Sequence, residues 1–435
     1  MNDIANKALE MAQKAGAQQA ACGISQAREV QVEWRDGQLQ KMSDATTRSL
    51  GLQLYVDGRY SSVSTSDLRP AALERFIGDT VAMTRLITPD PFRTLPDTEL
   101  YAGQSSADLE LFDPETEMLT PEDRLLRVQA LEAGARESKA EIISVTTAFS
   151  DSTSRSYRVH SNGFCGEKRQ SSAFISAEVT MQDKDGRRPE ESDYAGSRFL
   201  RALPDPVGIG RSATQRALSR LGAHKLASMT VPIVLDNRAS LRFLSYFLGP
   251  LSAAQVQQKR SYFEGRIGEK VAHELLTLTD DPLLPRGFGS RVFDGEGIAA
   301  KKLPILDHGV VKNLYVDTYY GKKLKMRPTT GGMSNLVVGL GDQDQAALLR
   351  SVGEGILITG FLGGNSNGTT GDFSLGIFGH RISHGQRAEP IAEMNISGNH
   401  LETWKHLAAL GNDPYPYSSM RAPTLVFEAM PVAGK

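Results

Sequence analysis

In the N-terminal part of the chain, apolar residues follow a helical period, then a strand period, then a helical period again. The first helical stretch is predicted to end at Gly16. Alternating apolar residues then precede Asp36-Gly37 and Asp57-Gly58, dipeptides that are typical of tight β-hairpin turns. Helical spacing returns between Asp67 and Leu86. This order of helix, strands and helix predicts an N-terminal α+β domain over residues 1–100.

A second unit of the same kind is predicted over residues 101–226. The proline-rich polar stretch 88–108 has no periodicity and indicates a linker before it. Thr120-Pro121 then supplies a cap and a first-turn proline for a helix. The β-rich stretches from about 142 to 199 predict an antiparallel meander, and a further helix is expected from about 208 to 221.

Residues 227–435 are predicted to form a mostly β C-terminal domain. A short apolar strand ends at Leu235, and Asp236-Asn237 is expected to cap an apolar helix that ends at Gly249-Pro250. Glycine-rich, β-like runs follow, with one capped helix over 342–352. The predicted fold class is therefore α+β, with N-terminal and middle units of helices and antiparallel sheet followed by this β-rich domain.

Composition and charge narrow the possible partners and the compartment. The 435 residues include 49 basic and 51 acidic side chains, which give a net charge of -2. No dense basic block is present, which disfavours direct contact with nucleic acid. No apolar run is long enough to span a membrane, and the N-terminus lacks a signal-peptide pattern. With Cys22 and Cys165 as the only cysteines, the chain is expected to be cytoplasmic and without disulfides.

Motifs for metal binding and nucleophilic catalysis are missing or incomplete. His273-Glu274 lacks the second histidine that a zinc-protease helix needs one turn later. His380 and His384 have helical ligand spacing but lie in a predicted strand, where residues four apart are about 13 Å from each other, too far to share one ion. No G-x-S-x-G elbow is present. The residues alone therefore indicate no catalytic group and no metal site.

A polar, glycine-rich loop from Gly363 to Asp372 lies between two apolar, strand-like stretches. It lacks the Lys-Ser/Thr ending of a phosphate-binding loop. Its glycines would let a ligand backbone approach closely, and its polar side chains could bond the main chain of an extended peptide. We predict peptide binding by Asn365, Thr370, Gly371 and Asp372. The alternative is that these side chains only satisfy the loop's own amide groups.

Six short motifs occur in a fixed order in the second half of the chain. They are Phe293–Ala299, Leu314–Tyr319, Gly332–Leu336, Thr370–Ser374, Ile396–Asn399 and Gly411–Asp413. In these motifs the chain resembles the TldD/TldE family of peptidase-like proteins, and in particular its TldE (PmbA) branch. The resemblance is strongest over residues 230–435 and continues more weakly upstream.

The resemblance also implies where a metal would be bound. In the TldD branch an HExxxH helix and a cysteine near the C-terminus hold zinc. Alignment places Ser245 and Pro250 at the histidine positions and Tyr246 at the glutamate position, and no cysteine follows Gly411. The resemblance therefore implies a degenerate motif without catalytic residues, no metal and no cofactor in this chain, and zinc only in a TldD-type partner.

The expected function follows from this loss of ligands. The family resemblance implies a non-catalytic TldE/PmbA-like subunit, paired with a TldD-type paralogous chain in a cytoplasmic metallopeptidase that processes short or unfolded peptides. A homodimer is possible in the absence of that partner. The older family label, modulator of DNA gyrase, finds no support in the charge pattern. Two alternatives stay open: a stand-alone hydrolase that uses His380 and His384, and a peptide-binding regulatory homodimer.

Overall fold

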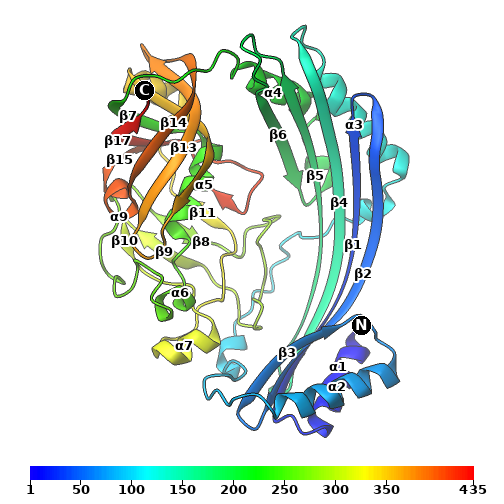
Figure 1. Cartoon of the computed structure of the whole chain (residues 1–435). Helices are drawn as coiled ribbons and strands as arrows, with labels where there is room; N and C mark the ends of the chain where they lie inside the picture. The colour runs from blue at the N-terminus through cyan, green and yellow to red at the C-terminus, as the bar shows by residue number, and fades with distance from the viewer.

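The structure, a computed structural model, describes residues 1–435 and consists of a long curved sheet that faces a compact C-terminal domain (Figure 1). The sheet is six-stranded and antiparallel. Its strands, in spatial order, are β3 (Arg59–Thr65), β2 (Gln38–Val56), β1 (Gln19–Arg35), β4 (Ile142–His160), β5 (Cys165–Met181) and β6 (Glu190–Ser197).

The two predicted hairpins are confirmed. Asp36 and Gly37, which join β1 to β2, have φ angles of 48° and 78°, and Asp57 and Gly58, which join β2 to β3, have 49° and 72°. Positive φ at both central residues is the geometry that matches the twist of a two-residue hairpin. The sequence therefore sets the register of the first three strands through its turns.

Pairing between β1 and β4 joins the first two predicted domains into one sheet. It runs from Ala21↔His160 to Arg35↔Thr146. Residues 1–100 supply β1 to β3 and residues 101–226 supply β4 to β6. The boundary predicted at residue 100 thus divides the sequence but not the sheet.

Four helices cover the face of this sheet that is turned away from the C-terminal domain (Figure 1). They are α1 (Asn2–Lys14), α2 (Pro70–Thr84), α3 (Pro121–Ala135) and α4 (Pro206–Leu218). The predicted start of α3 is confirmed by a reciprocal capping box between Thr120 and Asp123. Helices α3 and α4 touch through glycine, because a Cβ on Gly210 would lie 2.0 Å from the Leu131 carbonyl oxygen.

The C-terminal domain is mostly β, as predicted, and buries a core of 39 residues between two sheets. One sheet orders as β14 (Gln386–Asn399), β13 (Asp372–Ser383), β12 (Gly355–Ser366), β7 (Met229–Leu235), β17 (Leu425–Ala433) and β15 (Leu407–Leu410). The other orders as β10 (Val310–Val311), β9 (Leu303–Asp307), β8 (Leu278–Asp280), β11 (Leu336–Val338) and β16 (Met420–Arg421). The α+β fold class is confirmed.

Short helices connect the strands of this domain. They are α5 (Asn237–Leu248), α6 (Ala253–Gln257), α7 (Thr318–Leu324), α8 (Gln345–Val352) and α9 (His400–Thr403). The helix predicted over 342–352 begins later, with Asp344 as its cap. The reason is that Gln343 pairs with Gly411 and its carbonyl accepts the N–H of Asn412 at 2.9 Å. No helix of the chain is long and apolar enough to cross a membrane.

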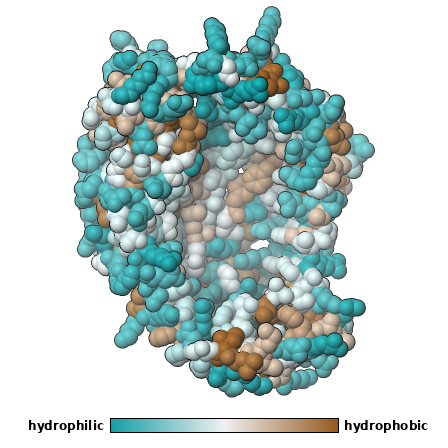
Figure 2. Space-filling model, in the orientation of Figure 1, coloured by the Kyte–Doolittle hydropathy of each residue, from teal (hydrophilic) through white to brown (hydrophobic).

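The predicted linker, residues 88–108, runs between the long sheet and the C-terminal domain and is hydrogen-bonded to the latter. It contains the 3₁₀ turn η1 (Thr98–Tyr101), and the second turn η2 (Pro114–Met118) follows it. Within the linker, Asp90 accepts the hydroxyl of Tyr319 at 2.7 Å, and Leu100 accepts the N–H of Ala299 at 2.9 Å. The sheet and the C-terminal domain therefore enclose a hollow that is visible in Figure 2.

Candidate functional site

The positions that the family resemblance aligned with the metal-binding motif lie at the end of helix α5, with Ser245 and Tyr246 in the helix and Pro250 just after it. Asp236 caps the helix by accepting hydrogen bonds from two first-turn backbone N–H groups, at 3.1 and 2.7 Å. The apolar face of the helix is buried, and Phe247 stacks on Trp404 with ring centroids 4.8 Å apart. Ser245 on the opposite face is exposed and Tyr246 is half-buried.

A pocket of about 410 Å³ lies against this exposed side of α5. Ser245, Tyr246 and Pro250 line it together with Gln255 and Arg260, and with Ser366, Gly368 and Thr369 from the β12–β13 connection. The degenerate motif and the predicted peptide-binding loop, which are far apart in the sequence, therefore meet at one pocket, which we call the α5 pocket.

The two polar side chains that α5 contributes to this pocket, Ser245 and Tyr246, both bond to Arg242. The Ser245 hydroxyl donates to the carbonyl oxygen of Arg242 at 2.7 Å. The guanidinium of Arg242 in turn donates to the hydroxyl oxygen of Tyr246 at 3.0 Å. Arg260 is the only charged residue that lines the pocket.

The four loop residues that we predicted to bind peptide bond mainly to the loop itself and to Asn399. The Thr370 hydroxyl donates to Asp372 at 2.7 Å, and the Asn399 amide donates to the second carboxylate oxygen of Asp372 at 2.9 Å. The Thr370 bond, followed by that from Asn399, lowers the pKa of Asp372. Gly371 has a φ of 88° and donates to the Asn367 carbonyl at 2.8 Å.

None of these four residues lines the α5 pocket. Asn365 is part of the ladder between β12 and β13, opposite Ser374. The loop residues that do line the pocket are Ser366, Gly368 and Thr369, which the sequence did not single out. Peptide binding by Asn365, Thr370, Gly371 and Asp372 stays a prediction.

His380 and His384 differ in their surroundings: the first is buried and the second is exposed. His380 is buried in β13, and its Nε2–H donates to the Ser219 carbonyl oxygen at 2.8 Å. Burial lowers the pKa of His380 to about 4. The side chain of His384 is 95% exposed at the turn after the strand, with a φ of 52°. The strand and turn predicted for this pair are confirmed.

His400 is a buried side chain next to α5 that sequence reasoning missed. Its Nε2 lies 3.0 Å from the Ser366 hydroxyl, and its ring contacts Phe243 and Phe373. Burial lowers the pKa of His400 to about 4, so the imidazole is neutral at pH 7. This histidine joins the pocket loop to the aromatic core beneath α5.

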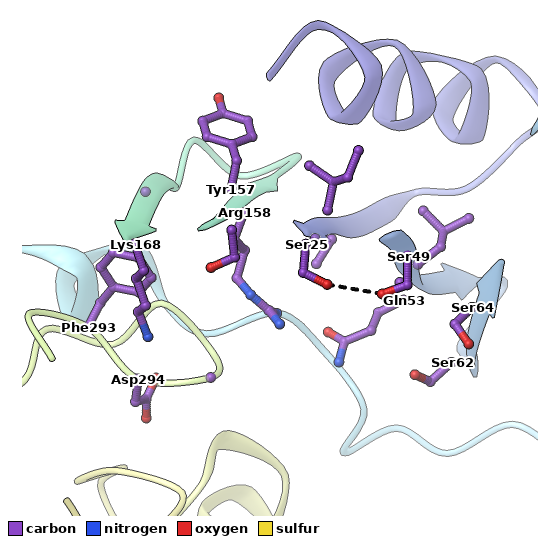
Figure 3. Close-up of a pocket in the computed structure, with 18 residues that line it drawn as sticks. Ser25, Ser49, Gln53, Ser62, Ser64, Tyr157, Arg158, Lys168, Phe293 and Asp294 are labelled. Atoms are coloured by element: carbon purple, nitrogen blue, oxygen red, sulfur yellow. Dashed lines mark hydrogen bonds between the residues drawn. The ribbon is translucent and has the colours of Figure 1, made fainter. Parts of the chain in front are cut away.

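A second cavity, of about 360 Å³, lies on the concave face of the long sheet (Figure 3). Arg158 and Lys168 extend into it from β4 and β5, opposite the loop that holds Phe293 and Asp294. We call it the sheet cavity. Its lining comes from five strands and the loop 293–295, and the glycines that interrupt otherwise strand-like sequence were the only signal for it.

Comparisons with known proteins agree with this architecture. Models of the PmbA/TldA metallopeptidase C-terminal domain, central domain and domain 1 match residues 228–434, 114–221 and 20–84. A solved Bacteroides thetaiotaomicron protein named as a modulator of DNA gyrase is 38% identical, with 100% of this chain and 99% of that chain covered and a TM-score of 0.97. The chain belongs to the PmbA/TldD family.

Other PmbA/TldD proteins match over nearly the whole chain. Metalloprotease PmbA of Escherichia coli is 25% identical, with 100% of this chain and 96% of that protein covered. TldE of Thermococcus kodakarensis superposes with a TM-score of 0.89 at 19% identity, covering 99% of this chain and 100% of that chain, which shows the shared fold. The family resemblance inferred from the six motifs is confirmed.

The α5 pocket of this PmbA/TldD chain does not fit a zinc ion. Zinc is held by imidazole nitrogen, thiolate sulfur or carboxylate oxygen, and the pocket residues supply none of these groups. The charged group that does line the pocket, the guanidinium of Arg260, would repel a cation. Elsewhere in the chain, no three His, Cys, Asp or Glu side chains form a group that could hold a metal ion.

Proposed function

We propose that this chain is the zinc-free, TldE-like subunit of a TldD/TldE-type metallopeptidase that processes short or unfolded peptides in the cytoplasm. The observation that carries the proposal is the α5 pocket. The chain has the family fold, and Ser245, Tyr246 and Pro250, which the resemblance aligns with the metal-binding motif, line a pocket that holds no zinc-binding side chain. A pocket without imidazole, thiolate or carboxylate ligands cannot position the zinc ion that activates water in a zinc peptidase.

The remaining architecture suits a supporting role. The curved sheet and the C-terminal domain enclose a hollow that is open in Figure 2, and the sheet cavity is lined by residues of both parts. Such a hollow can receive an extended chain while a TldD-type partner supplies the zinc. We infer that this chain contributes peptide binding to the pair and no catalytic group.

Reconstitution tests the proposal. The purified chain, a TldD-type chain with an intact HExxxH motif, and their mixture are each incubated with short peptides and with an unfolded protein. We expect cleavage that a chelator abolishes in the mixture and none from this chain alone. Elemental analysis should find far less than one zinc per molecule of this chain.

Two results would contradict the proposal. Cleavage by the isolated chain that His380→Ala abolishes would favour the stand-alone hydrolase. Failure to form a complex with the TldD-type chain, together with a homodimeric mass and no effect on the partner's activity, would favour the regulatory homodimer.

A further inference from the structure

The concave face of the long sheet carries a row of glycines around one arginine. Residues aligned across five strands at one level are Ser64, Gly51, Gly23, Arg158 and Gly166. Because both neighbours of Arg158 in this row are glycines, no side chain flanks it across the strands. A Cβ on Gly23 would lie 3.7 Å from Arg158 Nη2, so the guanidinium lies over the glycine backbone.

The next row on the same face adds a second cation and several hydroxyl groups. Ser49, Ser25, Ser156 and Lys168 follow one another across β2, β1, β4 and β5. Ser25 and Ser49 share a hydrogen bond of 3.0 Å. In Figure 3 the guanidinium of Arg158 lies between Lys168 on one side and this serine pair on the other.

Neither cation has an anionic partner in the chain. Arg158 and Lys168 form no ion pair and no hydrogen bond with another side chain, and Lys168 rests against the ring of Phe293 at 4.3 Å. Burial lowers the pKa of both groups, and that of Lys168 falls to about 8, with the nearby charge of Arg291 adding to the effect. Charged groups that are removed from water without a partner cost free energy unless a ligand supplies one.

Asp294 lines the cavity and Glu296 follows it in the same loop, and both carboxylates are already bonded within the C-terminal domain. Asp294 accepts the backbone N–H groups of Glu296 and Ile298 at 2.8 and 3.0 Å, and further bonds from residues 330 and 331. Glu296 accepts both the N–H and the hydroxyl of Thr318, at 2.8 and 2.9 Å. These bonds hold the loop opposite the sheet, and the guanidinium and ammonium groups remain unpaired.

We propose that the sheet cavity binds the carboxylate group of a peptide, held between Arg158 and Lys168 above the floor formed by Gly23 and Gly51. The peptide nature of the ligand rests on the proposed function, whereas the anionic group rests on the cavity itself. A volume of about 360 Å³ accommodates only the end of a peptide or one acidic residue, so the rest would lie along the hollow. The serine hydroxyls can donate to the same group or to adjoining amides.

Binding by the isolated chain tests this proposal. The probes are three peptides with a fluorescent label at the N-terminus: Ser-Ala-Ser-Ala-Ala with a free carboxylate, the same peptide as its C-terminal amide, and an amide in which the last residue is glutamate. Dissociation constants are measured by fluorescence anisotropy. A charge-assisted hydrogen bond of about 1.5–3 kcal/mol corresponds to roughly 10- to 100-fold tighter binding of the free acid than of the neutral amide.

The three probes identify the source of the carboxylate. Tight binding of the free acid alone assigns the cavity to a peptide C-terminus, and tight binding of the glutamate amide as well assigns it to any peptide carboxylate. Arg158→Gln and Lys168→Gln should each reduce the preference for the acid about tenfold. Arg155→Gln is the matched control, because Arg155 lies on the same strand, points to the other face and pairs with Glu167 at 2.5 Å.

Several results would overturn the proposal. They are equal affinity of the acid and the amide, no binding of any probe, or a preference for the acid that survives both cavity variants. Thermal unfolding checks that the variants are folded, and the wild-type comparison of acid with amide needs no variant. Because no partner and no cleavage enter this experiment, its outcome is independent of whether a TldD-type chain restores activity.

Discussion

The two faces of the long sheet differ in whether a buried arginine has a partner and in what their glycines allow. On the face covered by helices, Arg124 is 2% exposed and pairs with the buried Asp151 through two bonds, of 2.6 and 2.9 Å. On the concave face Arg158 has no partner. Gly210 in a covering helix allows close packing, whereas Gly51 on the concave face keeps space open. The difference indicates that the outer face is built for stability and the concave face for a ligand.

The largest predicted effect on stability is that of replacing Arg124, and it contrasts with the small effect expected for Arg158. Arg124→Gln leaves the buried carboxylate of Asp151 without its cation, so the free energy of unfolding should fall by about 3–5 kcal/mol. Arg158→Gln removes an unpaired charge and should change it by about 0.5 kcal/mol or less. Denaturant unfolding of both variants measures the contrast. Equal destabilisation would mean that Arg158 has a structural role, and the comparison would fail.

A smaller effect is expected at the glycines of α4. Gly210→Ala would place a Cβ 2.0 Å from the Leu131 carbonyl oxygen and 2.7 Å from the Ala135 nitrogen, which forces α3 and α4 apart. Overpacking of this kind costs about 1–3 kcal/mol of unfolding free energy. Gly208→Ala in the same helix is the control, because nothing lies within 4 Å of the Cβ that alanine would add, and its stability should be unchanged or higher.

The β12–β13 loop resembles the outer face of the sheet, because its polar side chains have hydrogen-bond partners within the chain. Asp372→Ala removes the acceptor for Thr370 and Asn399 and should lower the melting temperature slightly. Asp342→Ala, also exposed, is the control and should leave it unchanged. If Asp372→Ala keeps the wild-type melting temperature while the reconstituted pair loses peptide processing, the loop binds peptide as the sequence predicted.

Local sequence signals predicted the elements but not which of them assemble. The hairpins at Asp36-Gly37 and Asp57-Gly58 and the capped start of α3 follow from turn and cap chemistry within a few residues. The pairing of β1 with β4 has no such local signal, because it joins residues more than a hundred positions apart. Prediction therefore ended at three separate units, although the first two share one sheet.

For the same reason, the sequence predicted residues of the α5 pocket but not the sheet cavity. The α5 positions Ser245, Tyr246 and Pro250 were found because a short motif can be aligned residue by residue. The sheet cavity depends on the register that places Gly23 beside Arg158, and no short motif encodes that register. A site composed of single residues from five strands becomes visible only when the strands are assembled.

The last predicted change is a small gain in stability at the floor of the sheet cavity. At Gly51 the nearest atom to an added Cβ would be the Gly23 carbonyl oxygen at 3.9 Å, so alanine fits without strain. Alanine in place of a strand glycine should raise the free energy of unfolding by about 0.5–1 kcal/mol, because the unfolded chain loses conformational freedom. The added methyl group would stand on the cavity floor beside Gly23, the glycine over which the guanidinium lies. We therefore expect Gly51→Ala to unfold at a slightly higher denaturant concentration while binding the free-acid peptide several-fold more weakly.

Gly196→Ala, in β6 of the same sheet, should instead destabilise the protein, because its Cβ would lie 2.2 Å from the Phe174 ring. If Gly51→Ala gains stability and keeps full affinity for the peptide acid, the glycine floor does not hold the ligand, and the concave face differs from the outer face only in packing.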